Sequence, residues 1–561
     1  MNARPMLNAY PDSLGGTLGD LADFLDHPSV KGAFSSVYLL PSVFHSDLDR
    51  GFSVIDYGLN RLLAQPGDLD RLRAQGIHLK LDFILNHASV LSPQFQNLLT
   101  LGDRSPYREF FIDWNQFWAG RGAMTQEGYL QPDPEAIGSM FFRKPGLPLL
   151  MVRFPDGTEV PYWNTFYQEV RYSVPETPEL MRIAGLQYGE AEQLRDVLRD
   201  ALRRGLKPRD ADWGRFGDRQ APVLEWMDAH RSYLGQMDLN IQSPLVWQFY
   251  RETLETLAGY GAEVVRLDAF AYAPKEPGVR NFLNDPGTWD LLQRVADLAR
   301  PLGLTLLPEI HSRYADRIHE TIGAKGYPTY DFFLPGLVID ALERGTAEVL
   351  VRWIREIRDR GLRTVNMLGC HDGIPLLDLQ GLLPDQQIQN LIDTVVRRGG
   401  FVKDLHGQKN TYYQVNATYF SALGEDERKL LLARVIQLFM PGKPQIWYLD
   451  LFAGRNDRAA VEKAGPGGHK EINRTNLSWA DIGQGLVTDV VTRQLDLVRF
   501  RTECQAFGFE AHLEVLPSGP QELRLRWENA GCHATLEADL GRLTYRVDAQ
   551  GSGKTWSFRS D

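Results

Sequence analysis

The sequence is poor in the features that mark secreted, membrane-spanning and zinc-binding proteins. It has only three cysteines, Cys370, Cys504 and Cys532, which are too few and too scattered for a disulfide framework or a zinc site. No apolar run approaches the ~20 residues needed to cross a bilayer, and the first residues, MNARPMLNAYPDSLGG, lack the apolar centre of a signal peptide. These absences predict a soluble, cytoplasmic protein with three free thiols.

Positive charge is also scarce, because 72 acidic residues outweigh 61 basic ones and give a formal net charge of -11. No tract rich in Lys and Arg offsets this balance, so we expect neither a nucleic-acid partner nor a membrane partner. HExxH, paired CxxC and Walker motifs are absent, and GPGG at 465–468 lacks the strand-turn-helix setting of a phosphate loop. The sequence therefore predicts no nucleotide cofactor and no catalytic metal.

The 561 residues do contain a repeated alternation of short apolar segments with stretches of helical period. Strands that alternate with helices indicate parallel βαβ units, and this many units in one chain favour a (β/α)8 barrel over an open sheet. The predicted fold class is α/β, a TIM barrel with inserted subdomains and a small all-β C-terminal domain. The strand-like segments are 35–44, 78–87, 262–270, 304–312, 330–337, 364–372 and 444–452.

Two insertions interrupt the regular spacing. The stretch between His87 and the next clear strand is far too long for a loop, and residues 171–235 within it are charged and helix-prone, which suggests a helical extension or lid. The last residues, about 60 of them, alternate strand-like runs without helices, as a small β domain would. The predicted parts are 1–87, 241–373 and 431–500 for the barrel, 88–240 for an inserted subdomain B, 374–430 for a second insertion with a Gly-rich, aromatic loop, and 501–561 for the C-terminal domain.

Two opposite charges, Arg266 and Asp268, end the otherwise apolar run GAEVVRLDAFAY at 261–272. Residues two apart in a strand share a face, so the two side chains can pair and offset the cost of burial. Taken alone, the pair fits a structural ion pair as well as a catalytic one.

Three other predicted strands also end in polar residues. A lone strand-end Asp is often a helix cap and a lone His is often a core residue. Since the strands of a TIM barrel deliver their carboxyl ends to one mouth, four such endings in order favour an active site. The other three endings are Asn86-His87, Glu309-Ile310-His311 and His371-Asp372.

In this order, NH, RLDA, EIH and HD resemble the region pattern of the α-amylase superfamily, glycoside hydrolase family 13. Longer blocks, AEVVRLDAFAYAPKEPG, LPEIHSRY, HDGIPLLDLQGLLPD and YYQVNATYFSALG, resemble its sucrose phosphorylase subfamily. The resemblance covers about 35–500. It implies a barrel with an insertion after the third strand, and an enzyme that moves a glucosyl unit from an α-glucoside to phosphate with retention.

Retaining transfer needs one ionised carboxylate to attack the anomeric carbon and one protonated carboxyl to release the leaving oxygen. We expect Arg266 to hold Asp268 ionised as the nucleophile, and a partly apolar mouth to raise the pKa of Glu309, the acid/base. The resemblance implies that Asp372 grips sugar hydroxyls and stabilises the transition state. A catalytically inactive, amylase-like binding protein would lack one of these three carboxylates, and all three are present.

The resemblance also implies a set of residues around the glucosyl ring. Asp49 and Arg474 would bind its far edge and so limit the donor to one sugar unit. Phe52 and Phe166 would stack on it, although either ring could instead be ordinary core. The other substrate-binding candidates are His87, Arg266, His311, His371, Tyr413 and Gln414.

Phosphate needs cationic donors near the anomeric centre. Arg143 and Lys144, in FFRKPGLP, are the candidates, and Lys144 stands where sucrose phosphorylases tend to have arginine. In the predicted acceptor loop, HGQKNTYYQ, Thr411 replaces the acid that is usual in the subfamily, with Lys409 and His406 nearby. A loop that lacks the acidic residue and carries basic ones attracts an anionic leaving group and no longer repels it. These bases could also be solvated loop charges.

The long insertion and the basic loop resemble the glucosylglycerate phosphorylases of the subfamily. The specific prediction is reversible conversion of 2-O-α-glucosylglycerate and phosphate to α-D-glucose 1-phosphate and D-glycerate through a covalent glucosyl-enzyme. A phosphorylase of a neutral glucoside, sucrose or glucosylglycerol, is the alternative. Phosphate is a co-substrate and no cofactor is expected, while the oligomeric state stays open between a monomer and a homodimer.

Overall fold

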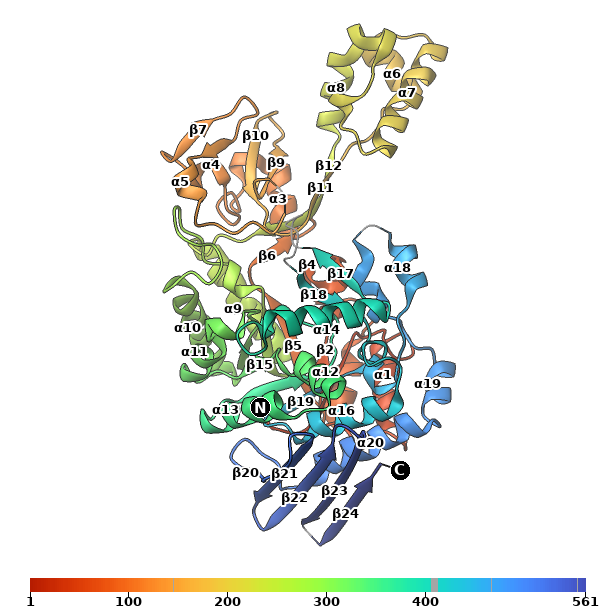
Figure 1. Cartoon of the computed structure of the whole chain (residues 1–561). Coiled ribbons are helices and arrows are strands. Elements are labelled where there is room, and N and C mark those ends of the chain that lie inside the picture. Colours follow the sequence, from red (N-terminus) through yellow and green to blue (C-terminus); the bar gives the residue numbers. More distant parts are fainter. Residues whose placement is uncertain (145, 405–411, 466, 552, 561) are drawn as a thin grey trace.

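The computed structural model describes residues 1–144, 146–404, 412–465, 467–551 and 553–560. Its centre is an eight-stranded parallel β-sheet closed into a barrel, which confirms the predicted fold class (Figure 1). The strands follow one another around the barrel in chain order, and β14 contacts β15. They are β1 (Met6–Ala9), β2 (Ser36–Leu39), β5 (His78–Ile84), β13 (Ala262–Asp268), β14 (Thr305–Pro308), β15 (Thr329–Asp331), β16 (Thr364–Met367) and β19 (Lys443–Trp447).

All seven predicted segments contain a barrel strand, but details differ. The sequence pattern did not indicate β1, because four residues with Asn8 among them carry little periodic signal. The strand predicted at 444–452 is wrong beyond Trp447, where the helix α17 (Tyr448–Leu451) begins. The strand predicted at 330–337 is wrong beyond Asp331. Oδ1 of Asp331 accepts the backbone N–H groups of Phe333 (3.2 Å) and Leu334 (3.0 Å), so α12 (Leu334–Arg344) begins at once.

Helices cover the outside of the barrel, and many of them are amphipathic. In α13 (Glu348–Asp359) the buried residues Leu350, Trp353, Ile354 and Ile357 recur every three or four positions, as one face of a helix requires. The other outer helices are α1 (Leu18–Asp26), α2 (Pro66–Ala74), α9 (Pro244–Gly259), α10 (Gly287–Ala299), α11 (Ile318–Ala324), α16 (Glu427–Phe439), α18 (Arg458–Ala464), α19 (Trp479–Gly485) and α20 (Asp489–Glu503).

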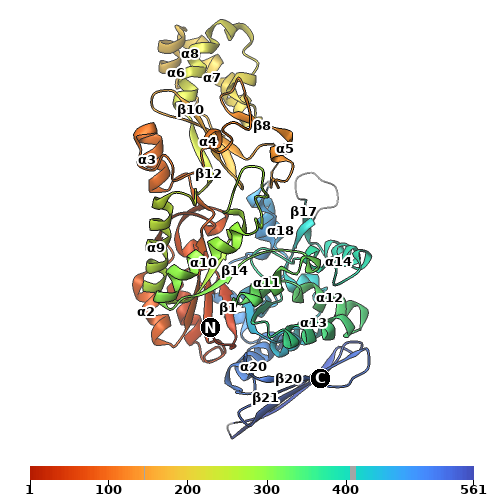
Figure 2. The same ribbon diagram turned by 90° about the vertical axis from the view of Figure 1, so that its left-hand side faces the viewer.

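Subdomain B lies at the end of the barrel opposite to the C-terminal sheet (Figures 1 and 2). Its own core is aromatic and is formed by Ile112, Trp114, Trp118 and Trp163. Its elements are α3 (Pro93–Leu101), α4 (Trp114–Phe117), β7 (Gly122–Met124), β8 (Leu130–Pro132), α5 (Pro134–Ile137), β9 (Leu149–Arg153) and β10 (Glu159–Trp163).

The helical extension projects from the rest of the molecule on a two-stranded stalk (Figure 1). The stalk strands β11 (Gln168–Arg171) and β12 (Ser232–Asp238) are antiparallel, and β12 also pairs with β6 (His87–Ser89). Helices therefore occupy only the centre of the predicted span 171–235. They pack around a separate apolar core and are α6 (Thr177–Ala184), α7 (Tyr188–Arg203) and α8 (Gln220–Ala229).

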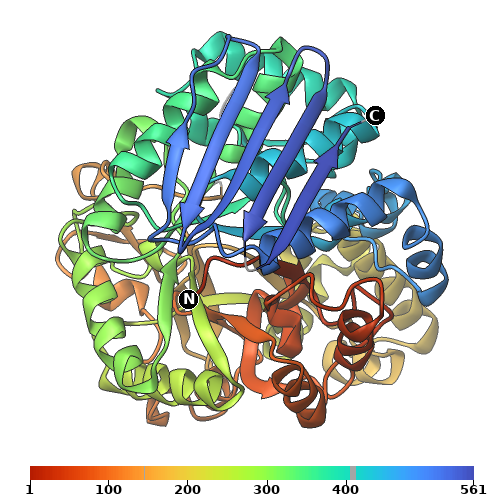
Figure 3. The same cartoon turned by 90° about the horizontal axis from the view of Figure 1, so that it is seen from below.

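The second insertion lies between β16 and α16 and contains α14 (Asp385–Arg397), β17 (Phe401–Asp404), β18 (Tyr412–Asn416) and α15 (Tyr419–Ala422). The C-terminal all-β prediction is confirmed by a five-stranded antiparallel sheet, which Figure 3 shows lying under one side of the barrel. Trp527 fixes this sheet to α16, since its indole N–H donates to the carbonyl oxygen of Phe439 at 2.9 Å. The sheet strands are β20 (His512–Val515), β21 (Glu522–Asn529), β22 (Cys532–Asp539), β23 (Thr544–Gly551) and β24 (Lys554–Arg559).

The three cysteines are buried free thiols, as predicted. Burial raises the pKa of Cys370 to about 12, so this thiol, next to His371 in the chain, is protonated at neutral pH. Of the helices in the described ranges, none is long and apolar enough to cross a membrane.

Candidate active site

Three carboxylates from neighbouring barrel strands meet at one buried guanidinium, that of Arg266, which is 2% exposed. Its Nη1 lies 2.6 Å from Oδ1 of Asp82 and 2.8 Å from Oδ1 of Asp268. Its Nη2 lies 2.6 Å from Oε1 of Glu309. The predicted pairing of Arg266 with Asp268 is confirmed, and the parallel register of β5, β13 and β14 adds the other two carboxylates.

The ionisation of these groups differs from the prediction. Burial raises the pKa of Asp268 well above its ordinary value against the attraction of Arg266, and the charges of Glu309 and Asp82 raise it further. Burial also opposes ionisation of Glu309, yet Arg266 and His311 outweigh it and lower the pKa of Glu309. The prediction of a raised pKa at Glu309 is wrong, because Arg266 and His311 stabilise its charged form. The expectation that Arg266 holds Asp268 ionised is wrong as well, because burial and the charges of Glu309 and Asp82 outweigh the attraction of Arg266. Asp268 and Glu309 therefore titrate as one coupled pair.

His311 is held between two carboxylates. Its Nδ1 lies 2.9 Å from Oδ2 of Asp378 and its Nε2 lies 3.6 Å from Oε1 of Glu309. Its ring stacks on Phe332 with 3.9 Å between the ring centroids. Burial opposes protonation of the ring, but Asp378 and Glu309 outweigh burial and raise the pKa of His311 to about 9.

We expect His311 to make the stability of the protein fall at alkaline pH. The pKa of a histidine is about 6.5 in an unfolded chain and about 9 at this site. Its stabilising contribution is therefore complete below about pH 6.5 and is lost as the pH rises through about 9. The free energy of unfolding in urea, measured from about pH 6 to about pH 9.5, should fall more for the wild type than for His311→Gln. Asp378→Asn should weaken the same trend, and parallel curves for all three proteins would contradict the raised pKa.

A second charge cluster surrounds Asp372. Its Oδ2 lies 3.1 Å from Nε2 of His371 and its Oδ1 lies 2.7 Å from Nζ of Lys470. Lys470 also reaches Oδ2 of Asp49 at 3.1 Å, and Nη1 of Arg474 lies 3.2 Å from Oδ1 of Asp49. Burial opposes ionisation of Asp372, but His371 and Lys470 hold its pKa well below the ordinary value. The structure brings the predicted residues together and adds Lys470, which the sequence analysis did not name. Its position in KEINRTN, the segment that also contains Arg474, was the available indication.

Both predicted stacking rings contact predicted site residues. Phe52 lies next to the hairpin of β3 (Phe44–Leu48) and β4 (Ser53–Leu59). It stacks on His371 with 4.9 Å between ring centroids and 9° between the planes. The ring of Phe166, half-buried, lies 5.0 Å from that of His87. These contacts place both phenylalanines beside predicted site residues, and Phe52 is at the same time a buried member of the main apolar core.

His87 differs from its expected position and contacts. It lies in β6, since the barrel strand β5 ends at Ile84. Its Nε2 is 3.0 Å from the carbonyl oxygen of Phe52, and its Nδ1 is 3.3 Å from Nδ2 of Asn86. Burial lowers the pKa of His87, which keeps the ring neutral. Both ring nitrogens thus have a protein partner, and the ring orients the backbone at Phe52.

Two charged residues of β5, Lys80 and Asp82, were missed by sequence reasoning. Asp82 accepts a hydrogen bond from the hydroxyl of Tyr38 at 2.9 Å. Lys80 lies with its Nζ 2.6 Å from Oε1 of Gln445, and 3.7 Å from the centre of the Tyr38 ring. Burial and the charge of Arg266 lower the pKa of Lys80 well below its ordinary value. The polar residues at positions 80 and 82 share one face of the strand, and this was the available signal.

Arg143, the first of the two predicted phosphate-binding residues, lies beside the rings of Phe166 and Tyr272. The guanidinium carbon of Arg143 is 5.0 Å from the ring centre of Phe166 and 5.6 Å from that of Tyr272. Its Nη1 donates to the hydroxyl of Tyr272 at 3.2 Å. Lys144 donates to Oδ1 of Asn164, and burial lowers the pKa of Lys144 to about 8. Arg143 is therefore held against the aromatic edge of the site.

The acceptor loop is only partly covered by the structure. Gln414 is buried on β18. The described residues do not include His406, Lys409 or Thr411, and they do not include the side chain of Tyr413.

The buried ammonium of Lys275 joins subdomain B to the barrel. Its Nζ lies 2.7 Å from Oδ2 of Asp238, 2.6 Å from the carbonyl oxygen of Tyr272 and 3.2 Å from Oδ1 of Asn86. These three partners come from β12, from the chain after β13 and from the link between β5 and β6. The interaction fixes the three segments that surround the site relative to one another.

Across the described parts of the chain, His319, Glu320 and Glu356 form a group whose geometry could hold a metal ion. Two arginines already neutralise its carboxylates: Arg317 lies 2.8 Å from Glu356, and Arg360 lies 3.0 Å from Glu320. The group is therefore an ion-pair network on the outer helices.

No family model matches the chain, but individual relatives do. A sucrose 6(F)-phosphate phosphorylase from Ilumatobacter coccineus is 50% identical over 561 residues, which cover 98% of this chain and 97% of that protein. This chain belongs to the sucrose phosphorylase subfamily of the α-amylase superfamily. It is a glucoside phosphorylase, an enzyme that transfers hexosyl groups.

Other members differ in how closely they resemble this phosphorylase. The crystal structure of sucrose 6F-phosphate phosphorylase from Thermoanaerobacter thermosaccharolyticum matches with a TM-score of 0.81 and 29% identity, over 100% of this chain and 98% of that one. A glucosylglycerate phosphorylase from Escherichia coli is 28% identical over 83% of this chain and 70% of its own length. The relatives named for the substrate that the sequence suggested are thus the more distant ones.

Proposed function

We propose that this phosphorylase cleaves sucrose 6F-phosphate with inorganic phosphate and yields α-D-glucose 1-phosphate and fructose 6-phosphate. The observation that carries the proposal is the 50% identity, over 98% of the chain, to the sucrose 6(F)-phosphate phosphorylase of Ilumatobacter coccineus. A phosphorylated leaving group also agrees with the bases in the acceptor loop.

In the proposed mechanism Asp268 attacks the anomeric carbon and forms a covalent glucosyl-enzyme while Glu309 protonates the leaving oxygen. Phosphate then attacks the same carbon and displaces Asp268 as a carboxylate, Glu309 accepts the proton of the phosphate, and the α configuration is retained. The proton that the pair shares must lie on Glu309 in the first step. Arg266 contacts both carboxylates and stabilises whichever of them is ionised.

The second charge cluster would bind the glucosyl ring. Asp372 has a lowered pKa, so it is an anion that accepts hydrogen bonds from sugar hydroxyls. Asp49 and Arg474, with Lys470 beside them, would close the far side of the ring and limit the donor to one sugar unit. Phosphate is a co-substrate in this scheme, which needs no nucleotide or metal. The cytoplasmic location and the oligomeric state stay predictions.

The second candidate substrate is 2-O-α-glucosylglycerate, which the sequence suggested. Its leaving group, D-glycerate, is also an anion, so Lys409 and His406 fit either substrate. A neutral leaving group is disfavoured by the presence of Thr411 where an acid is usual. Charge alone therefore separates the neutral acceptors from the anionic ones but does not separate the two anions.

An acceptor assay in the synthetic direction tests the proposal. The enzyme is given α-D-glucose 1-phosphate with fructose 6-phosphate, D-glycerate, fructose, glycerol or no acceptor, and phosphate release is followed. We expect kcat/KM for fructose 6-phosphate to exceed that for fructose by ~10-fold or more, since one charge-assisted contact contributes at least about 1.4 kcal/mol. Fastest release with glycerate would favour the second candidate. Fastest release with fructose or glycerol, or equal release without acceptor, would contradict an anionic leaving group.

A further inference from the structure

The segment of subdomain B that carries Arg143 and Lys144 is held by the barrel loop that follows the Asp268 strand. The side-chain amide of Asn281, in the chain between β13 and α10, forms two hydrogen bonds with the backbone of Phe141. The N–H of Phe141 donates to Oδ1 of Asn281 at 2.8 Å, and Nδ2 of Asn281 donates to the carbonyl oxygen of Phe141 at 2.9 Å.

The surroundings of Asn281 make these two bonds hard to replace. Asn281 is 2% exposed, so losing either bond would leave a buried polar group without a partner. Nearby contacts join the same two segments: Oγ of Ser139 donates to the carbonyl oxygen of Gly278 at 3.3 Å. The rings of Phe141 and Phe282 also lie 6.4 Å apart. Residues 139–141, which end two positions before Arg143, are thus attached to the loop after β13.

Arg143 lies just after the part of the segment that Asn281 holds. Arg143 is two residues after Phe141, and its guanidinium lies beside Tyr272, another residue of the same barrel loop. Tyr272 in turn contacts Phe282, which follows Asn281, at 4.6 Å. The loop after β13 therefore contacts this segment at two places, at Arg143 through Tyr272 and at Phe141 through the two hydrogen bonds of Asn281. Phe166 packs on Arg143 from outside the loop.

We infer that Asn281 is a positioning residue that holds Arg143 where phosphate must approach the glucosyl-enzyme. This inference rests on the proposed function, because it assumes that Arg143 binds the incoming phosphate. Asn281 itself touches no reacting atom. Its contribution is to the capture of phosphate and not to the cleavage of the donor.

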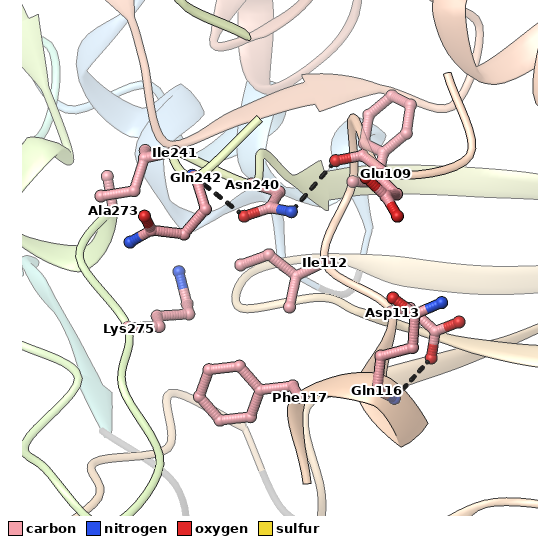
Figure 4. Close-up of a pocket in the computed structure, with 11 residues that line it drawn as sticks. Glu109, Ile112, Asp113, Gln116, Phe117, Asn240, Ile241, Gln242, Ala273 and Lys275 are labelled. Carbon is pink, nitrogen blue, oxygen red and sulfur yellow. Dashed lines mark hydrogen bonds between the residues drawn. The ribbon is translucent and has the colours of Figure 1, made fainter. Parts of the chain in front are cut away.

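The chain offers a control of the same residue type in Asn240, which follows β12 and joins the end of subdomain B to its start. Nδ2 of Asn240 donates to the carbonyl oxygen of Glu109 at 3.0 Å, and its Oδ1 accepts the N–H of Gln242 at 3.1 Å. These residues border a pocket of about 220 Å³ whose lining includes none of the predicted site residues (Figure 4). Asn240→Asp therefore makes the same chemical change away from Arg143.

The experiment compares Asn281→Asp, Asn240→Asp and Arg143→Gln in the full-length enzyme. We measure kcat and KM for inorganic phosphate with the best donor of the acceptor assay, and the slow release of glucose without phosphate. Asn281→Asp should raise KM for phosphate by ~10-fold, the equivalent of one lost hydrogen bond, and leave glucose release within ~2-fold of the wild type. Asn240→Asp should leave both quantities within ~2-fold.

A double variant distinguishes positioning from a general loss of structure. Because Asn281 acts through Arg143, adding Asn281→Asp to Arg143→Gln should raise KM for phosphate little further. Full additivity, or an equal loss of phosphorolysis and glucose release in Asn281→Asp, would overturn the inference. If Asn281→Asp fails to fold, Asn281→Ala removes both bonds without adding a charge and is subject to the same criteria. An unchanged KM for phosphate in Arg143→Gln would instead contradict the proposed role of Arg143.

Discussion

Replacing Asp268 with asparagine is expected to lower kcat for phosphorolysis by ~10⁴-fold or more, as removal of a covalent nucleophile does in other enzymes. The amide has the size of the carboxylate, so it should keep the contact with Arg266 and leave donor binding largely unchanged. It cannot form the glucosyl-enzyme. The measurement is the initial rate of α-D-glucose 1-phosphate formation, together with the KM for the donor.

Asp82→Asn provides the comparison for this variant. Asp82 contacts the same guanidinium, at 2.6 Å, but is fully buried beneath the site. Its loss should change the ionisation of the coupled pair and lower kcat far less than the loss of the nucleophile. If Asp268→Asn retains more activity than Asp82→Asn, the assignment of Asp268 as the nucleophile is wrong.

Arg266→Met is expected to reduce both stability and activity. Removing the cation leaves three buried carboxylates without their shared partner, and breaking such a buried pair costs about 3–5 kcal/mol. The pKa values of the unpaired acids are then raised in the folded variant, so the loss of stability should be greatest at neutral pH and should diminish as the pH falls. Unfolding in urea at about pH 7.5 and about pH 5.5 measures both effects.

The control for this variant is Arg231→Met, at the residue that directly precedes the stalk strand β12. Arg231 is also mostly buried and pairs with Glu159 and Asp228, but it lies outside the barrel. The Arg231→Met substitution should destabilise the protein without the fall in kcat that is expected for Arg266→Met. Equal losses of kcat in the two variants would show that Arg266 acts only through the stability of the fold.

The barrel and the candidate catalytic carboxylates could be predicted because their signals lie in short, local segments. Most barrel strands lie in apolar runs of a few residues, and Asp268, Glu309 and Asp372 each follow or end such a run. In a TIM barrel, strands in chain order place these ends side by side. Local sequence therefore indicated which residues meet, although it did not predict β1 or the early end of β15.

The partners of those carboxylates could not be predicted in the same way. Asp82 and Arg266 are 184 residues apart in the chain, and Asp49 and Arg474 are 425 apart. Lys470 lies in a polar segment that has no strand pattern, and His87 is turned toward the backbone of Phe52 by the short strand β6. None of these contacts follows from the spacing of residues within one segment.

The amino-acid sequence by itself determined the fold class and the strand-end carboxylates, because hydrophobic period and strand endings are properties of neighbouring residues. The subfamily followed from the resemblance of longer blocks such as AEVVRLDAFAYAPKEPG. Only the tertiary structure decided how charge is shared among the carboxylates. Arg266 contacts Asp82, Asp268 and Glu309 at once, which reversed the predicted direction of the pKa shift at Glu309. A pKa depends on burial and on distances of a few ångströms between charges, and those distances exist only once strands far apart in the chain lie side by side.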